Sequence, residues 1–171
     1  MKIYNSLTRS KDYLIPLDEG RIGMYVCGPT VYDEPHIGHA RSAYIFDVVR
    51  RYLVYKGYAV KFVRNVTDVD DKIIGKAKAG AGAGLVEATK EISKRYLDAY
   101  HRDMGTLGIG APDVEPKATE YIPKMIKYIE RLISAGNAYA SGGDVYFDIK
   151  KARGYGKLSN QDIGKMEAGA R

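Results

Sequence analysis

The hydrophobic and polar positions of residues 22–66 predict a strand, a helix and a second strand. Ile22–Cys27 is a short apolar run that ends at Gly28-Pro29, which is typical of a buried strand. From Ile37 to Tyr55 the apolar residues recur at helical spacing, and Gly57 then provides a helix stop. Tyr58–Val66 is again apolar and β-branched. Two strands joined by one helix predict a parallel pair with a right-handed crossover, as in half of a nucleotide-binding α/β domain.

The second half of the chain has a different pattern. Residues 75–84 contain only Gly, Ala and Lys and show no apolar face, so we expect a mobile loop there. Apolar positions at helical spacing predict helices over residues 85–104 and 117–135. Residues 139–148 predict a β-hairpin that turns at Gly142-Gly143.

Composition narrows the class of protein. Within the 171 residues no run reaches about 18 consecutive apolar positions, so we expect no membrane span. The polar, mixed-charge segment after Met1 argues against a secretory signal, and a single cysteine, Cys27, cannot form an internal disulfide. Both features favour a cytoplasmic protein. The formal net charge of +6 permits contact with a polyanion such as RNA.

The densest set of chemistry-bearing residues lies between the first predicted strand and the helix. His36 and His39 are three residues apart at a helix start, beside backbone N–H groups that we expect to be free and the positive end of the helix dipole. Gly38 lets a flat or charged ligand approach the backbone. This combination suits the binding of a nucleotide and the stabilisation of charge on its phosphates. Local capping of the helix by the histidines is the alternative, and a metal site lacks obvious companion ligands.

Several segments together carry a family signature. They are Ile3–Arg9, Met24–Asp33 with His36–His39, Arg64–Ile73, and the terminal Gly156–Ser159 and Gly169–Arg171. In order and spacing they resemble cysteinyl-tRNA synthetases, a family of class I aminoacyl-tRNA synthetases. The resemblance implies the first half of a Rossmann-type nucleotide-binding catalytic domain in residues 1–75. It implies a connective insertion of helices and a small β-hairpin in residues 76–171.

The resemblance also implies an activity and a site. The family's cysteine–tRNA ligases activate cysteine with ATP and magnesium to cysteinyl-adenylate, and then transfer the cysteinyl group to tRNA(Cys). His36 and His39 match the catalytic signature histidines, and with Gly38 they are expected to bind ATP. Gly28 and Thr67 match positions that line the amino-acid pocket.

Cys27 matches a family residue that binds both zinc and, through the zinc, the amino-acid thiolate. A soft thiolate binds zinc, whereas the hydroxyl of serine does so poorly. Zinc can therefore discriminate cysteine from serine, which an apolar pocket could not do by size. In the family the other zinc ligands and the Lys-Met-Ser-Lys-Ser signature occur later in the sequence than the part that these 171 residues match. Lys165-Met166 is followed by Glu167 and Ala168, so it does not match that signature. We therefore expect a truncated chain with little or no aminoacylation activity alone.

Some roles and functions stay open. Thr67 and Asp68 could instead form a polar strand end that caps the next segment, and Asp70 and Asp71 are expected to be solvated or capping. The alternative functions are a cysteine–amino-sugar ligase of mycothiol synthesis, a small adenylyltransferase and a non-catalytic truncated paralogue. The oligomeric state is not readable from the sequence.

Overall fold

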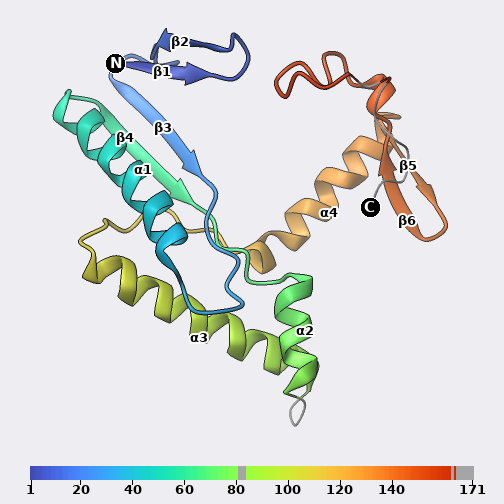
Figure 1. Cartoon of the computed structure of the whole chain (residues 1–171). Helices are drawn as coiled ribbons and strands as arrows, with labels where there is room; N and C mark the ends of the chain where they lie inside the picture. The colour runs from blue at the N-terminus through green and yellow to red at the C-terminus, as the bar shows by residue number, and fades with distance from the viewer. Residues whose placement is uncertain (81–83, 163, 165–171) are drawn as a thin grey trace. The chain divides into compact units, whose positions relative to one another are not determined.

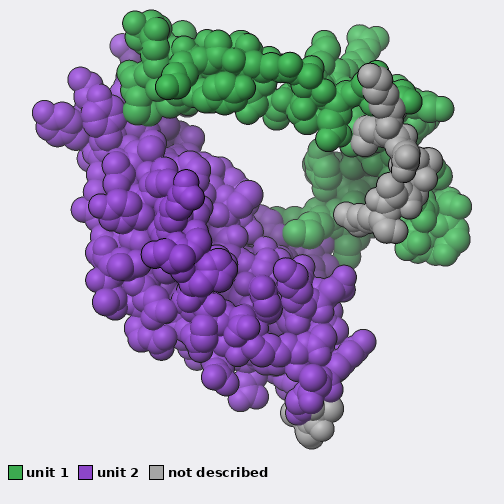
Figure 2. All heavy atoms as spheres, viewed as in Figure 1, with its two compact units in different colours: residues 1–15, 123–171 green, residues 16–122 purple. Residues whose placement is uncertain are grey.

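The structure, a computed structural model, describes residues 1–80, 84–162 and 164. These residues form two compact units, residues 16–122 and residues 1–15 with 123–171 (Figure 2). Each unit is described by itself below. Within the described residues no helix has the length and apolar character needed to cross a membrane.

The larger unit is built on the predicted strand–helix–strand arrangement (Figure 1). Strand β3 (Arg21–Val26) leads to helix α1 (Ile37–Tyr55), and strand β4 (Ala59–Arg64) follows. The two strands are parallel and in register from Arg21↔Ala59 to Val26↔Arg64, which confirms the prediction. Gly57 ends the helix region with a φ of +88°, a left-handed conformation that glycine adopts without steric cost.

Strand β4 has backbone partners on both sides. On the side away from β3, Arg64 N–H donates to the Val114 carbonyl at 3.1 Å, and Val66 N–H donates to the Pro116 carbonyl at 2.9 Å. Beyond the strand ends, Thr30 and Thr67 form a further parallel bridge. The Phe62 side chain of β4 is completely buried, and the guanidinium carbons of Arg50 and Arg64 lie 5.3 and 5.0 Å from the centre of its ring.

Helices α2 (Asp71–Ala79) and α3 (Leu85–Thr106) pack against each other, and α2 contradicts the predicted loop. The Asp70 carboxylate accepts a hydrogen bond from Lys72 N–H at 3.0 Å and so caps the start of α2. Ile73 and Ala77, one helical turn apart, are buried. This burial offsets the cost of Gly75, about 0.5–1 kcal/mol for a helix interior. The rest of the predicted loop, residues 81–83, lies outside the described residues.

The smaller unit contains two antiparallel hairpins. Strands β1 (Lys2–Asn5) and β2 (Ser10–Tyr13) form a hairpin that the sequence analysis did not predict. Strands β5 (Ala138–Ser141) and β6 (Asp144–Phe147) form the predicted one, and a short 3-10 helix follows at Ile149–Lys151. Gly142 and Gly143 have φ values of +61° and +92°, as a two-residue type I′ turn requires.

Helix α4 (Ala118–Ser134) begins in the larger unit and continues into the smaller one. It agrees closely with the helix predicted over residues 117–135. Pro123 lies within its second turn, and most of its large apolar side chains are exposed: Tyr121, Ile122, Met125, Ile126, Tyr128, Ile129 and Ile133. The predicted division of the chain at residues 75 and 76 concerns the family architecture, and it stays a prediction.

Candidate functional site

Helix α1 begins with a capping box made by the two histidines. His36 is the N-cap residue, and its Nδ1 accepts a hydrogen bond from Gly38 N–H at 3.1 Å. His39 reaches back, and its Nδ1 accepts from His36 N–H at 3.2 Å. The ring centroids are 4.1 Å apart. Since both Nδ1 atoms accept, the hydrogen of each neutral ring lies on Nε2. The pair therefore offers two Nε2–H donors.

The expectation of free backbone N–H groups at this helix start is wrong for the groups nearest the rings. The N–H groups of His36 and Gly38 are taken by the rings, and those of His39 and Ala40 both donate to the His36 carbonyl. A ligand at this helix start therefore meets ring Nε2–H groups in place of these amides. The helix dipole still favours an anion here.

The position of the His36 ring leaves no room for a side chain at residue 38. A Cβ at this position would lie 2.8 Å from His36 Cε1 and 3.0 Å from its Nδ1. Any larger residue would push the His36 ring away and break the cap. The glycine between the histidines thus has a packing reason, beside the ligand approach expected from the sequence.

Four of the predicted site residues line one hollow. These are Cys27 and Gly28, which directly follow β3, and Gly38 and His39 at the start of α1. We refer to it as the site hollow. Cys27 is exposed and sits at the carboxyl end of its strand, the edge where open α/β sheets bind ligands. The full lining comprises Cys27, Gly28, Pro29, Gly38, His39, Ser42, Ala43, Arg64 and Tyr100.

The other two predicted site residues lie next to this lining. The His36 ring packs against His39 at a tilt of 41°, but His36 lines a neighbouring pocket together with Pro35 and Asp103. Thr67 follows β4, and its N–H donates to the Pro29 carbonyl at 3.0 Å. Val31 N–H donates back to the Thr67 carbonyl at 3.3 Å. Thr67 therefore holds the segment after β3 through its backbone, and it is not among the residues that line the site hollow.

Lys76 on α2 binds the segment at Tyr32 and Asp33, which leads to the histidines. Its ammonium donates to the Tyr32 carbonyl at 3.0 Å, to Asp33 Oδ1 at 3.1 Å and to the Tyr96 hydroxyl at 2.7 Å. The Tyr96 and Asp33 contacts raise the pKa of Lys76. The Glu34 backbone N–H and Lys76 lower the pKa of Asp33. The sequence analysis missed Lys76 because it placed this residue in a loop.

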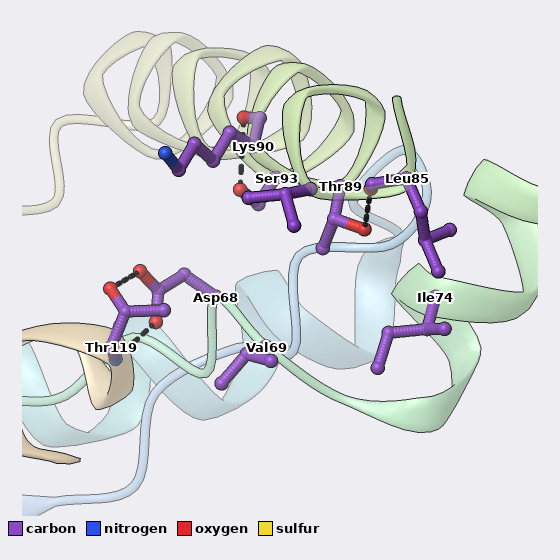
Figure 3. A pocket seen from close by; sticks show the side chains of 9 residues that line it. Asp68, Val69, Ile74, Leu85, Thr89, Lys90, Ser93 and Thr119 are labelled. Atoms are coloured by element: carbon purple, nitrogen blue, oxygen red, sulfur yellow. Dashed lines mark hydrogen bonds between the residues drawn. The ribbon is translucent and has the colours of Figure 1, made fainter. Parts of the chain in front are cut away.

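Asp68 has a structural role at the start of α4. Its two carboxylate oxygens accept hydrogen bonds from Thr119 N–H at 3.0 Å and from the Thr119 hydroxyl at 2.5 Å (Figure 3). Thus Asp68 caps the distant helix α4, whereas the next segment along the chain, α2, is capped by Asp70, so the capping alternative is right about the role of Asp68 and wrong about the segment. Together with Val69, Ile74 and Leu85 it lines an apolar pocket of about 290 Å³ that contains none of the predicted site residues.

Burial, and then the neighbouring His36, lower the pKa of His39 below the 6.5 of an unperturbed histidine. The folded chain therefore binds fewer protons at His39 than the unfolded chain. This contribution to stability is complete above about pH 6.5 and is lost as the pH falls through the folded pKa. An NMR titration should find the His39 midpoint below 6.5, and His36→Asn should raise it. An unchanged midpoint in that variant would contradict the role of His36.

Comparison with known proteins assigns the chain to a family. The family described as "tRNA synthetases class I (C) catalytic domain" matches residues 13–171. This chain belongs to the class I (C) tRNA synthetases. A solved structure described as an arginyl-tRNA synthetase from Campylobacter jejuni shares the fold, with a TM-score of 0.59 and 14% identity over 77% of this chain and 38% of that one. The α/β fold expected from the sequence is thereby confirmed.

Relatives within this synthetase family match the full chain. The cysteine–tRNA ligase of Syntrophobacter fumaroxidans is 52% identical over 100% of this chain and 34% of its own length. That of Lachnoclostridium phytofermentans is 54% identical over 100% of this chain and 35% of its own. The cysteine–tRNA ligase of Magnetococcus marinus is 48% identical over 99% of this chain and 34% of its own length. The chain spans about a third of the length of the curated relatives it matches.

The described part of this synthetase chain does not by itself provide a zinc site. No group of three or more His, Cys, Asp or Glu side chains comes close enough together in residues 1–80, 84–162 and 164 to hold a metal ion. Structural and catalytic zinc sites use three or four protein ligands. Cys27 therefore supplies at most one ligand of such a site.

Proposed function

We propose that this chain provides the first half of the active site of a cysteine–tRNA ligase. The complete site would activate cysteine with ATP and magnesium, and then transfer the cysteinyl group to tRNA(Cys) in the cytoplasm. One observation carries the proposal: Cys27 and Gly28 line the same hollow as Gly38 and His39. The residues proposed for the amino acid and those proposed for ATP are therefore neighbours, as the attack of a carboxylate on a phosphate requires.

The histidines suit the role of charge stabilisers. Adenylate formation builds negative charge on the phosphates of ATP, and preorganised donors aimed at that charge lower the barrier. The two Nδ1 atoms are held by backbone N–H groups, so both rings are fixed and both Nε2 atoms can donate. The lowered pKa of His39 keeps its ring neutral near pH 7. A neutral ring donates its Nε2–H to a phosphate oxygen without adding a proton-transfer step.

The amino-acid end of the proposal rests on Cys27, Gly28 and Thr67. We include Cys27 as one thiolate ligand of zinc, whose remaining ligands would come from outside the described residues. Gly28 N–H is held by Asn65 Oδ1 at 3.0 Å, which fixes the backbone that faces the hollow. The curated relatives cited above are all cysteine–tRNA ligases, and this supports the function over an amino-sugar ligase or a small adenylyltransferase.

A chimeric enzyme tests the proposal. This chain would replace the matching first third of the Syntrophobacter fumaroxidans cysteine–tRNA ligase, with which it shares 52% identity. We expect cysteine-dependent ATP–pyrophosphate exchange and charging of tRNA(Cys) with kcat/KM within about tenfold of the parent enzyme. The 171-residue chain alone should show neither activity. Serine in place of cysteine is the specificity control. A folded chimera without cysteine-dependent exchange would contradict the proposal, as would exchange by the chain alone.

A further inference from the structure

Arg64 is a buried cation at the site hollow that the sequence analysis did not single out. It is the last residue of β4, and it is only 3% exposed. One guanidinium nitrogen donates to the Tyr100 hydroxyl at 3.3 Å, and the other donates to the Ala43 carbonyl at 3.5 Å. The guanidinium also lies 5.0 Å from the centre of the Phe62 ring. All of these partners are uncharged, and both hydrogen bonds are long.

The neighbouring arginines are paired differently. Arg50 contacts Asp113 at 2.9 Å, and Arg51 contacts Asp47 at 2.7 Å. Among the described residues, none of the ion pairs involves Arg64. A buried charge is costly unless an opposite charge compensates it, so such groups are normally paired. The most deeply buried of these three arginines is thus the one that has no carboxylate within ion-pair distance among the described residues, although Glu115 lines a second pocket together with Arg64 and Tyr100.

The location of Arg64 relates its charge to the candidate site. It lines the site hollow together with Cys27 and His39. Gly28 lies directly against its stem, because a Cβ built on Gly28 would come within 3.2 Å of Arg64 Cγ. Thr67, a residue proposed for the amino acid, follows Arg64 three positions later. Arg64 therefore shares the lining of the site hollow with a residue proposed for the amino acid and one proposed for ATP, and with Tyr100 it also lines the pocket next to it.

Tyr100 adds a second donor at the same place. Its hydroxyl oxygen accepts from Arg64, so its own hydrogen remains available to a further acceptor. Burial raises the pKa of the Tyr100 hydroxyl, which keeps that hydrogen in place at neutral pH. Both Arg64 and Tyr100 line the site hollow. A guanidinium and a neutral hydroxyl side by side form a recognition site for a carboxylate.

We propose that Arg64, with the Tyr100 hydroxyl, binds the carboxylate of the amino-acid substrate in the site hollow. The proposal rests on the proposed function and extends it to the group that undergoes activation. The hollow measures about 100 Å³, whereas pockets for drug-sized ligands hold roughly 300–1,000 Å³. It therefore fits a small amino acid better than the phosphates of a nucleotide. A carboxylate held there lies between Cys27 and His39, where it can meet a phosphate at the start of α1.

The test compares two ligands that differ in the carboxylate alone. L-cysteine and cysteamine share the thiol and the amine, and cysteamine lacks the carboxylate. Each is titrated into the full 171-residue chain while NMR follows the amides of Gly28 and Gly38. We expect cysteamine to bind about tenfold or more weakly, since a hydrogen-bonded charge pair is lost. Equal affinities, or no saturable binding of L-cysteine, would overturn the proposal. Saturable binding of inorganic phosphate without binding of L-cysteine would assign the cation to ATP and would also overturn it.

Variants show whether Arg64 is responsible for this preference. Arg64→Met keeps the length of the side chain and removes the charge, so we expect the ratio of the two affinities to fall to about one. Arg102→Met, on the exposed surface of α3, is the matched control and should leave the ratio unchanged. Because the wild-type comparison needs no variant, an unfolded Arg64→Met chain does not affect the test. An inactive chimera would contradict the proposed function alone, and a lost cysteine preference would contradict the Arg64 site alone.

Discussion

His39→Asn in the chimeric synthetase should lower kcat by about a hundredfold or more and leave stability nearly unchanged. Asparagine is a short side chain whose Oδ1 can replace Nδ1 of the ring. It can therefore still accept the hydrogen bond that His36 N–H donates at 3.2 Å. It has no donor at the position of Nε2. The variant thus removes the Nε2–H donor that we propose acts on the phosphates, and keeps the acceptor that holds the helix start.

His39→Gln reverses these two effects. The Gln amide nitrogen extends to about the position of Nε2, and the Nδ1 acceptor is lost. We expect a smaller loss of kcat than with Asn, and a stability loss of about 1 kcal/mol from the broken cap. The measurements are pyrophosphate-exchange kinetics of the chimera and urea unfolding of the 171-residue chain. If Asn preserved activity and Gln abolished it, capping would be the main contribution of His39 and the catalytic assignment would fail.

Gly28→Ala should destabilise the chain by about 3 kcal/mol or more. A Cβ at this position would lie 1.5 Å from the Asn65 backbone oxygen and 2.7 Å from its carbonyl carbon. A flexible side chain can move out of the way, but this neighbour is the backbone that directly follows β4. The two segments after the parallel strands would have to separate, and the bond from Gly28 N–H to Asn65 Oδ1 would break. Urea unfolding of the 171-residue chain measures the loss.

Gly23→Ala is the matched control for this effect. Gly23 lies on β3, five residues earlier, and a Cβ built there meets no atom within 4 Å. The free energy of unfolding should change by less than about 1 kcal/mol, and alanine should stabilise β3 slightly through the lower entropy of the unfolded chain. A similar loss in both variants would show that the strand backbone, and not the contact with Asn65, limits position 28.

Local patterns identified the elements whose apolar faces are wide. Ile22–Cys27, Ile37–Tyr55 and Tyr58–Val66 correspond closely to β3, α1 and β4, and Gly142-Gly143 marks the turn of the second hairpin. Helix α2 was missed because Ile73 and Ala77 form a stripe only two residues wide. That stripe is stabilised by packing on α3, and no local pattern reports such a contact.

Strands β1 and β2 were missed for a related reason. Ser10–Tyr13 contains no alternation of apolar and polar residues, and the hairpin is held instead by side-chain hydrogen bonds. The Asp12 carboxylate accepts from Asn5 at 3.1 Å, and also from Thr8 and Ser10. Hydrogen bonds of this kind depend on the folded geometry of the turn. Residues 5–12 are polar except for Leu7, and such a run alone indicates only a loop.

The sequence pattern pointed to those residues of the hollow's lining that are close together along the chain, and gave no sign of those that the fold brings to it. The stretch from Cys27 to His39 contains most of the predicted site within 13 positions. Arg64 and Tyr100 reach the same hollow from β4 and α3. The one local signal for Arg64 is its parity: it alternates with the buried Phe62 and Val66, whereas the other charged residue of the strand, Lys61, lies on the opposite face. Charged residues at buried positions in such strands are candidates for ligand contact.

Because of the capping box, the exchange of two backbone amide hydrogens depends on the positions of the histidine rings. The amide of His36 is held by the His39 ring, and the amide of Gly38 is held by the His36 ring. Neither amide can exchange its hydrogen with deuterated water until the ring that holds it turns away or the helix end frays. The exchange rates of these two amides therefore measure how rigidly the rings are held. A ligand that binds through the Nε2–H groups will slow both rates without contacting either amide.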